Sequence, residues 1–159
     1  LWGAKPFAAI HAAPPCQRHS KMSGCRPGLA DTYDDLIAPT REALQQTGLP
    51  YVIENVPGAP LKAPIELCGF MFGYELYRHR LFETNWPLLA PEHPPHTKPS
   101  SRAGHWRPGT VISISGHVAP MKLAREVMDI SWTNREELAE AIPPYYTEHI
   151  GRQLLEWMQ

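Results

Sequence analysis

Residues 7–20 read FAAIHAAPPCQRHS, and this stretch sets the first element of the fold. Its apolar start predicts a buried strand over residues 7–11, which Pro14 and Pro15 end abruptly. Cys16 follows at once, and a thiol on a rigid loop after a strand is a mounting typical of nucleophiles. The pattern also fits a buried, unreactive cysteine, because free cysteines are among the most buried residues.

The next segments predict how this strand is paired. Residues 31–47 predict a helix that Gly48 ends, and Pro39 is expected to kink that helix or to split off its first turn. Residues 51–54 are β-branched or aromatic for the most part and predict a second strand. Two strands that flank a helix form a strand–helix–strand unit, so we expect a parallel sheet.

The rest of the chain predicts shorter elements around a loop rich in proline and histidine at residues 87–109. Thr133 and Glu136 stand at the spacing of a capping box, and Pro143 and Pro144 suit the start of a last helix. The glycines of the Gly69-x-x-x-Gly73 pattern are expected to serve a turn and close packing. The predicted strands are residues 78–84 and 110–115, and the predicted helices are residues 121–128, 133–141 and 144–158.

Four groups along the chain together resemble one enzyme family. In order, they are Pro15-Cys16-Gln17, Glu54-Asn55-Val56, the Arg78-x-Arg80 pair and the tail AIPPYYT at residues 141–147. These groups resemble those of the DNA cytosine-5 methyltransferases, most of all the compact enzymes of phages and actinobacteria, and the resemblance covers nearly the whole chain. It implies methyl transfer from S-adenosylmethionine to carbon 5 of cytosine in DNA.

The resemblance also implies a role for individual residues. Cys16 matches the nucleophile that adds to carbon 6 of the base, and Glu54 matches the acid at ring nitrogen 3. To donate a proton near neutral pH, Glu54 needs a pKa raised from ~4.3 towards about 6–7. Arg78 and Arg80 match the arginines that hold the cytosine oxygen and the glutamate. The implied substrate contacts are Pro15, Gln17, Arg18, Ser20 and Asn55, and the implied cofactor contacts are Pro14, Pro143 and Tyr145.

The resemblance implies further partners and a compartment. Chemistry on a base within double-stranded DNA requires the cytosine to be flipped out of the stack. A cytoplasmic protein, encoded by a prokaryote or a phage, is expected.

The chain departs from the family in its cofactor-binding part. No GxG pattern occurs in the 159 residues, and the first strand matches the family's fourth. We therefore expect the N-terminal cofactor-binding half to be missing, in a fragment or in half of a split enzyme. The expected fold is α/β, the second half of a Rossmann-like methyltransferase sheet. The expected parts are a catalytic half at residues 1–86, a short target-recognition-like insert at 87–118, and C-terminal helices at 119–159 that return to the catalytic domain.

Composition limits the other classes. The formal net charge is −1, so no overall basic signature indicates nucleic acid, although a local patch would suffice. Three cysteines without a CxxC pair argue against a disulfide framework or a structural zinc site and fit a reducing cytosol. No tight ligand spacing relates His93, His96, His105 and His117, so no metal site is expected.

Three alternatives to DNA methylation remain open at this stage. The same chemistry on RNA needs the same residues. A DNA-binding remnant without activity would explain the missing cofactor half. A cysteine hydrolase that uses Cys16 and His19 is a third, but it leaves the Glu54-Asn55-Val56 group without a role.

Overall fold

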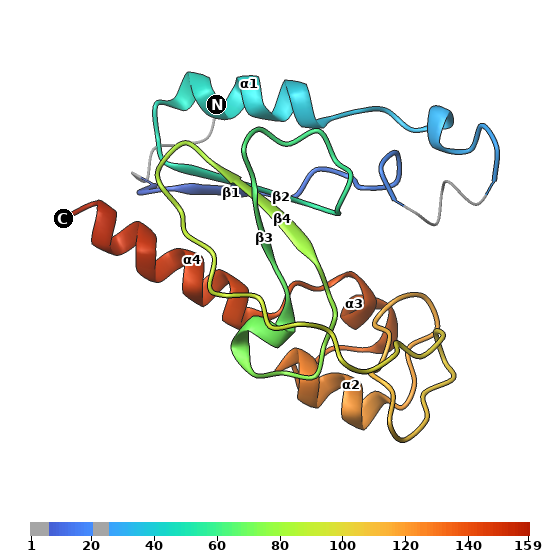
Figure 1. Ribbon diagram of the computed structural model, residues 1–159. Helices are drawn as coiled ribbons and strands as arrows, with labels where there is room; N and C mark the ends of the chain where they lie inside the picture. Colours follow the sequence, from blue (N-terminus) through green and yellow to red (C-terminus); the bar gives the residue numbers. More distant parts are fainter. Residues whose placement is uncertain (1–6, 21–25) are drawn as a thin grey trace. The chain divides into compact units, whose positions relative to one another are not determined.

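The computed structural model describes residues 7–20 and 26–159, and it divides the chain into two compact units (Figure 1). The first unit holds the chain up to residue 66 together with residues 80–89. The second holds residues 67–79 and 90–159. Residues 67–79 therefore group with the segments that the sequence assigned to the insert and to the C-terminal helices.

A four-stranded mixed sheet forms the centre of the first unit, apart from the last residue of its third strand, Leu67. Its strands are β1 (Ile10–Ala12), β2 (Tyr51–Asn55), β3 (Ile65–Leu67) and β4 (Arg80–Thr84), in the order β1-β2-β4-β3. β1 and β2 are parallel, with Ala12 opposite Ile53, which confirms the strand–helix–strand unit. The fold is therefore α/β.

The sheet as a whole is mixed and not parallel as expected, because β4 runs antiparallel to β2, with Glu54 opposite Phe82. Parallel neighbours need a crossover, usually a helix, to return the chain to the same end of the sheet. Residues 56–79, all of them described, contain β3 and the 3₁₀ helix η3 (Gly69–Phe72) but no α-helix. The chain therefore comes back in the opposite direction.

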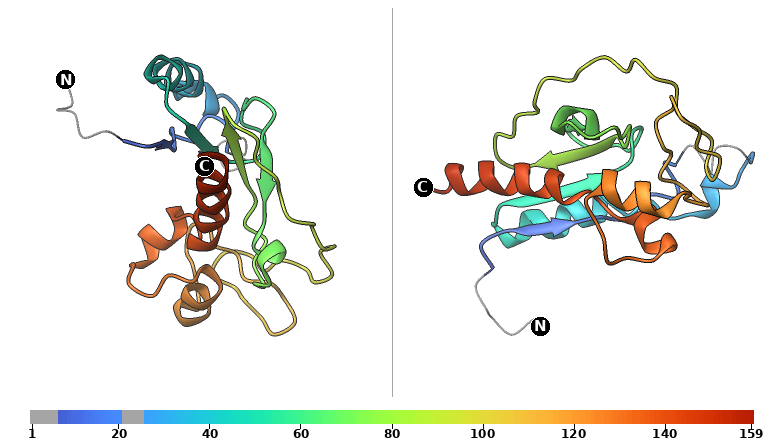
Figure 2. Two further views of the ribbon diagram at one scale, coloured as in Figure 1. Left: turned by 90° about the vertical axis from the view of Figure 1, so that its left-hand side faces the viewer. Right: turned by 90° about the horizontal axis from the view of Figure 1, so that it is seen from below.

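Helix α1 (Ile37–Thr47) covers one face of β1 and β2 (Figures 1 and 2). It begins six residues later than predicted, and Ala30–Thr32 form a separate 3₁₀ turn, η2. Pro39 lies in the first turn of α1, where its missing N–H costs no bond within the helix. Gly48 ends the helix in the left-handed conformation, with φ of 68°, as expected. Leu44 packs there with Tyr51 and Ile53 of β2.

The second unit contains three α-helices among its described residues. They are α2 (Met121–Met128), α3 (Arg135–Glu140) and α4 (Pro144–Trp157), and α2 has the predicted bounds. The capping box of α3 lies one residue later than predicted, because Asn134 and Glu137 each accept a backbone N–H from the other. Along α4, Tyr146 and Ile150 are buried, but Trp157 is 51% exposed, so the burial of apolar side chains decreases toward the C-terminus of the helix.

The predicted strand at residues 110–115 is wrong. The segment is extended and buries Val111, Ile112 and Ile114, so burial does not alternate strictly along it. Its backbone groups are bonded in other ways: Ser101 Oγ accepts the N–H of Ser113, and Arg78 donates to the carbonyl of Ile114. Only one isolated bridge, from Val111 to Ser100, resembles a strand ladder.

Across the described residues, no helix has both the length and the apolar character needed to cross a membrane.

Candidate active site

The loop that carries Cys16 is fastened to the end of β2. Cys16 is a partly exposed free cysteine, four residues beyond β1. The carbonyl of Cys16 accepts the N–H of His19 at 3.0 Å, which closes a turn directly after the thiol. Asn55, fully buried at the end of β2, donates from Nδ2 to the carbonyl of Pro14 at 2.9 Å. The asparagine of the Glu-Asn-Val group therefore holds the loop of the candidate nucleophile.

The parallel pairing of β1 and β2 brings two candidate groups to one edge of the sheet. The carboxyl ends of adjacent parallel strands lie together, and this edge is where open α/β sheets bind their ligands. Cys16 follows the carboxyl end of β1, and Glu54 is the penultimate residue of β2. The bond from Asn55 to Pro14 ties these two strand ends to each other.

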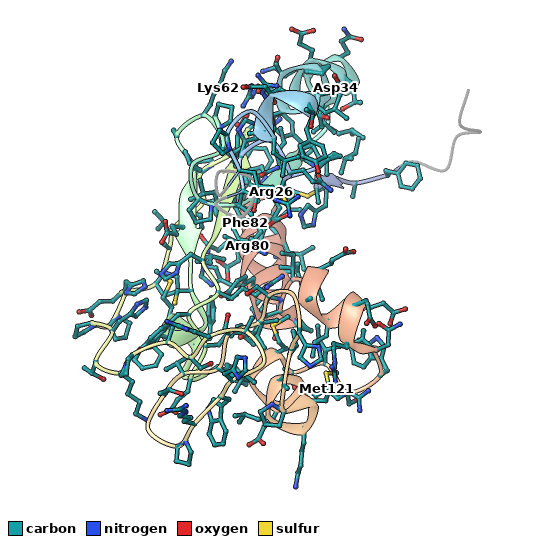
Figure 3. All side chains as sticks on the ribbon, turned by 90° about the vertical axis from the view of Figure 1, so that its right-hand side faces the viewer. Arg26, Asp34, Lys62, Arg80, Phe82 and Met121 are labelled. Atoms are coloured by element: carbon teal, nitrogen blue, oxygen red, sulfur yellow. The ribbon has the colours of Figure 1, made fainter. Side chains whose placement is uncertain are left out.

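Glu54 and Arg80 form an ion pair across β2 and β4, with 3.0 Å between Glu54 Oε1 and Arg80 Nε. The register explains it: Glu54 lies opposite Phe82, and Arg80, two residues before Phe82, points to the same strand face. Arg80 and Phe82 are labelled in Figure 3. Side chains in this diagonal relation are within reach when they are long. The Glu54 and Arg80 side chains are only 9% and 17% exposed, so the pair lies mostly out of water.

Arg78 belongs to the second unit, where it serves the packing. Its two terminal nitrogens donate to the carbonyls of Ile114 and Ala139 at 2.7 and 2.8 Å. Its own carbonyl accepts the hydroxyl of Tyr146 at 2.6 Å. The two terminal nitrogens of Arg78 therefore bond to backbone of the second unit, whereas Arg80 pairs with Glu54.

The predicted DNA-contacting residues of the Cys16 loop lie on or near the surface. Pro15 and Gln17 are exposed, and Ser20 is half-buried. Arg18 donates to the carbonyl of Tyr33 at 2.8 Å and lies 3.9 Å from the exposed Asp31 carboxylate. Arg18 therefore links this loop to the segment that precedes α1.

The three residues expected to contact S-adenosylmethionine make packing contacts in this structure. The carbonyl of Pro14 already accepts the Asn55 amide. Pro143 is buried at the start of α4. The hydroxyl of Tyr145 donates to the carbonyl of Val127 at 3.0 Å, and burial raises the pKa of Tyr145. Each of these contacts lies within the unit to which its residue belongs.

The sequence interpretation missed a buried ion pair behind the site. Arg41 of α1 and Glu83 of β4 form two hydrogen bonds, of 2.6 and 2.7 Å. The signal was present, since Arg41 falls at helical spacing between the buried Ile37 and Leu44. A charged residue on the apolar stripe of a helix needs a buried partner.

His19, the partner of Cys16 in the hydrolase alternative, faces a carboxylate. Its Nε2 lies 3.3 Å from Asp35 Oδ1. Asp35 also accepts the N–H of Ile37 at the start of α1, and this bond above all lowers the pKa of the Asp35 carboxyl. His19 therefore helps to fasten the turn after Cys16 to the helix. Cys25 lies outside the described residues.

The sequence was compared with models of known protein families and with curated proteins, and neither comparison gave a match.

Proposed function

We propose that this chain carries the base-activating part of a DNA cytosine-5 methyltransferase. The observation that carries the proposal is the joining of two strand ends. Asn55 bonds to the loop of Cys16, and the neighbouring Glu54 pairs with Arg80. A thiol, a carboxyl group and a guanidinium thus belong to one small part of the sheet. The motif order supports the family, and the α/β sheet is compatible with half of a Rossmann-like domain.

The proposed chemistry begins with the Cys16 thiolate. Its sulfur adds to carbon 6 of a flipped cytosine, and a new sulfur–carbon bond forms. The electron pair of the C5=C6 bond shifts toward ring nitrogen 3, which takes a proton. Carbon 5 becomes enamine-like and able to accept an electrophilic methyl group. The carbon 5 hydrogen then leaves as a proton to water, its electron pair re-forms the C5=C6 bond as the sulfur–carbon bond breaks, and the proton on nitrogen 3 returns to Glu54.

Glu54 and Arg80 are proposed to bind the edge of the cytosine that carries nitrogen 3 and the ring oxygen. Glu54 supplies the proton at nitrogen 3, and Arg80 orients the Glu54 carboxyl and holds the ring oxygen. A positioned general acid contributes about 10²–10⁴-fold to a rate. Because Arg80 grips the carboxyl through Nε at 3.0 Å, it limits where that carboxyl can point.

The methyl donor of the family is S-adenosylmethionine, and its site is assigned to a segment beyond these residues. Double-stranded DNA is the proposed substrate. The same chemistry on RNA and an inactive DNA-binding remnant remain outcomes of the test.

The test uses the first half of the reaction, which needs no methyl donor. Addition at carbon 6 lets carbon 5 take a proton from water, so elimination exchanges the carbon 5 hydrogen. The chain should release tritium from DNA that carries [5-³H]cytosine, and Cys16→Ala should release none. Glu54→Gln should slow the release by about 10²–10⁴-fold, whereas Glu42→Gln, an exposed change on α1, should not.

The alternatives give different results. Tritium release from RNA but not from DNA would move the substrate to RNA. DNA binding without release in the wild-type chain would indicate the inactive remnant. His19→Ala should keep the exchange reaction, because His19 has no part in it. Exchange that survives in Cys16→Ala contradicts the assignment of the nucleophile.

A further inference from the structure

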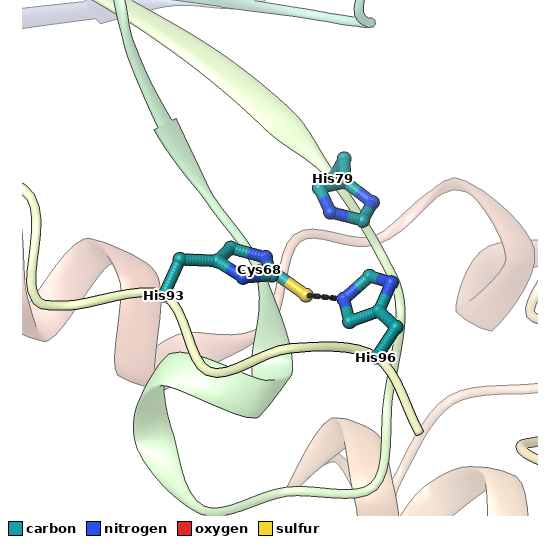
Figure 4. Close-up of side chains that lie close together, drawn as sticks. All are labelled: Cys68, His79, His93 and His96. Carbon is teal, nitrogen blue, oxygen red and sulfur yellow. Dashed lines mark hydrogen bonds between the residues drawn. The ribbon is translucent and has the colours of Figure 1, made fainter. Parts of the chain in front are cut away.

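Four potential metal ligands meet within the second unit. They are Cys68, His79, His93 and His96, and one ligand atom from each lies within 4.8 Å of all the others. Cys68 directly follows β3, His79 directly precedes β4, and His93 and His96 come from the proline-rich loop. Figure 4 shows the side chains directed toward one another. No metal site was expected from the sequence, because the ligands come from three separate segments.

The spacing suits a tetrahedral ion. With Zn–N about 2.0–2.1 Å and Zn–S about 2.3 Å, neighbouring ligand atoms of such a site lie roughly 3.3–3.6 Å apart. The Sγ of Cys68 and the Nε2 of His96 are 3.5 Å apart, at that spacing. The widest separation in the cluster is 4.8 Å. His93 and His96 are exposed loop residues, so a small movement of the loop would close the remaining distance.

Other contacts hold the imidazoles in place. The ring of His96 stacks on Tyr77 at 3.6 Å between centroids, and Phe70 meets it edge-on at 5.8 Å. The Nδ1 of His93 lies 2.8 Å from the carbonyl of Pro94. A carbonyl only accepts, so Nδ1 carries the proton and Nε2 keeps the lone pair. Metal-binding histidines are oriented in this way by their outer partners.

We propose that Cys68, His79, His93 and His96 form a structural zinc site. One thiolate and three imidazoles are ligands that Zn²⁺ accepts, and four protein ligands leave no position for a reacting water. The site fastens residues 90–98 to residues 68–79. The same two segments are joined by the ion pair of Lys98 with Glu75 and by the bond from the N–H of Lys98 to the Tyr77 hydroxyl. This inference does not depend on the proposed methyl transfer.

The test is metal binding by the whole chain, after treatment with a chelator and titration with Zn²⁺ alone. We expect one zinc ion per chain. With Co²⁺ in place of zinc, the chain should show tetrahedral bands and a thiolate-to-cobalt charge-transfer band, and Cys68→Ser should lose the charge-transfer band. Loss of an outer partner typically weakens binding by 10–100-fold, so the double variant His93→Ala/His96→Phe should lose at least about 100-fold.

The double variant keeps the inference testable if Cys68→Ser, a change at a fully buried residue, fails to fold. It alters two exposed side chains, and the phenylalanine preserves the stacking on Tyr77. His105→Ala is the matched control, because His105 is an exposed histidine on the same loop and lies outside the cluster. Equal zinc affinity in the double variant and the control, or a cobalt spectrum without the thiolate band, would overturn the zinc site.

Discussion

Replacing Glu83 by glutamine tests the buried ion pair that fixes β4 to α1. The Glu83 and Arg41 side chains are 2% and 8% exposed, so neither charge is solvated by water. Glu83 accepts three hydrogen bonds, two from Arg41 at 2.6 and 2.7 Å and one from the N–H of Lys62 at 2.7 Å. Glutamine has nearly the same shape, so the substitution removes charge and acceptor capacity without opening a cavity.

The expected cost follows from what the substitution leaves behind. The glutamine offers one acceptor oxygen and turns an NH₂ group toward donors, while the Arg41 guanidinium stays charged and buried. Removing one partner of a buried pair costs about 3–5 kcal/mol. Whole domains are stable by about 5–15 kcal/mol, so the loss should be plain in denaturant unfolding. Glu42→Gln, the exposed neighbour on α1, should change little.

Acid should reproduce part of this effect. Burial by itself would raise the pKa of Glu83, but the bonds from Arg41 and the Lys62 N–H outweigh it, and the pKa is lowered from 4.5. A group with a lowered pKa in the folded state stabilises the fold above its unfolded value and loses that contribution as pH falls through the folded value. The free energy of unfolding should fall below pH ~4.5 in the wild type and less steeply in Glu83→Gln. A loss under about 1 kcal/mol for Glu83→Gln would refute a buried pair.

Two further predictions concern packing and the methyl donor. At Gly69 an added Cβ would lie 2.7 Å from the carbonyl oxygen of Leu76. Gly69→Ala should therefore lower the free energy of unfolding by about 1–3 kcal/mol, as measured by thermal unfolding. Gly151→Ala is the control and should not destabilise the chain, because an added Cβ there would meet nothing within 4 Å. The 159-residue chain alone should transfer no labelled methyl to DNA, because it contains no GxG loop and reacting groups misplaced by about 1 Å already lose about 10²-fold. Fusion to a segment with the family's first three strands should restore transfer, and micromolar affinity of the isolated chain for S-adenosylmethionine in calorimetry would contradict this prediction.

Local signals in the sequence predicted most of the elements that they control directly. Gly48 ends α1 in a left-handed conformation, and Pro144 opens α4, because each residue favours a backbone geometry on its own. Gly69 and Gly73 serve close packing and a left-handed turn, as expected. The strand predicted for residues 110–115 is absent, although the segment is extended. A strand needs a neighbour, and a local pattern does not say whether one is present.

The candidate site, too, was predictable from the sequence only in part. The link between the Cys16 loop and Asn55 follows from adjacent parallel strands, which the strand–helix–strand pattern predicted. The different uses of Arg78 and Arg80 did not follow. These residues are two positions apart and look alike in the sequence, but the unit boundary falls between them. The cluster of Cys68 with three histidines was equally hidden, because its members meet only through the tertiary fold.

The two faces of β4 carry different residues: one carries the buried ion pair with α1, and the other carries the arginine of the candidate site. Successive side chains of a strand point to opposite faces, so Arg80 and Phe82 share one face and Glu83 lies on the other. Glu83 is opposite Ile53, on the face that α1 covers, and Arg80 reaches Glu54 on the reverse face. The effect of a register slip shows what this arrangement requires. A slip of β4 by one residue would exchange its two faces.

Such a slip would bury the Arg80 guanidinium under α1 and remove Glu83 from Arg41. A buried ion pair contributes little net stability over an apolar pair, and a role in fixing one arrangement is better supported. We therefore expect the Arg41–Glu83 pair to favour the β4 register that presents Arg80 to Glu54.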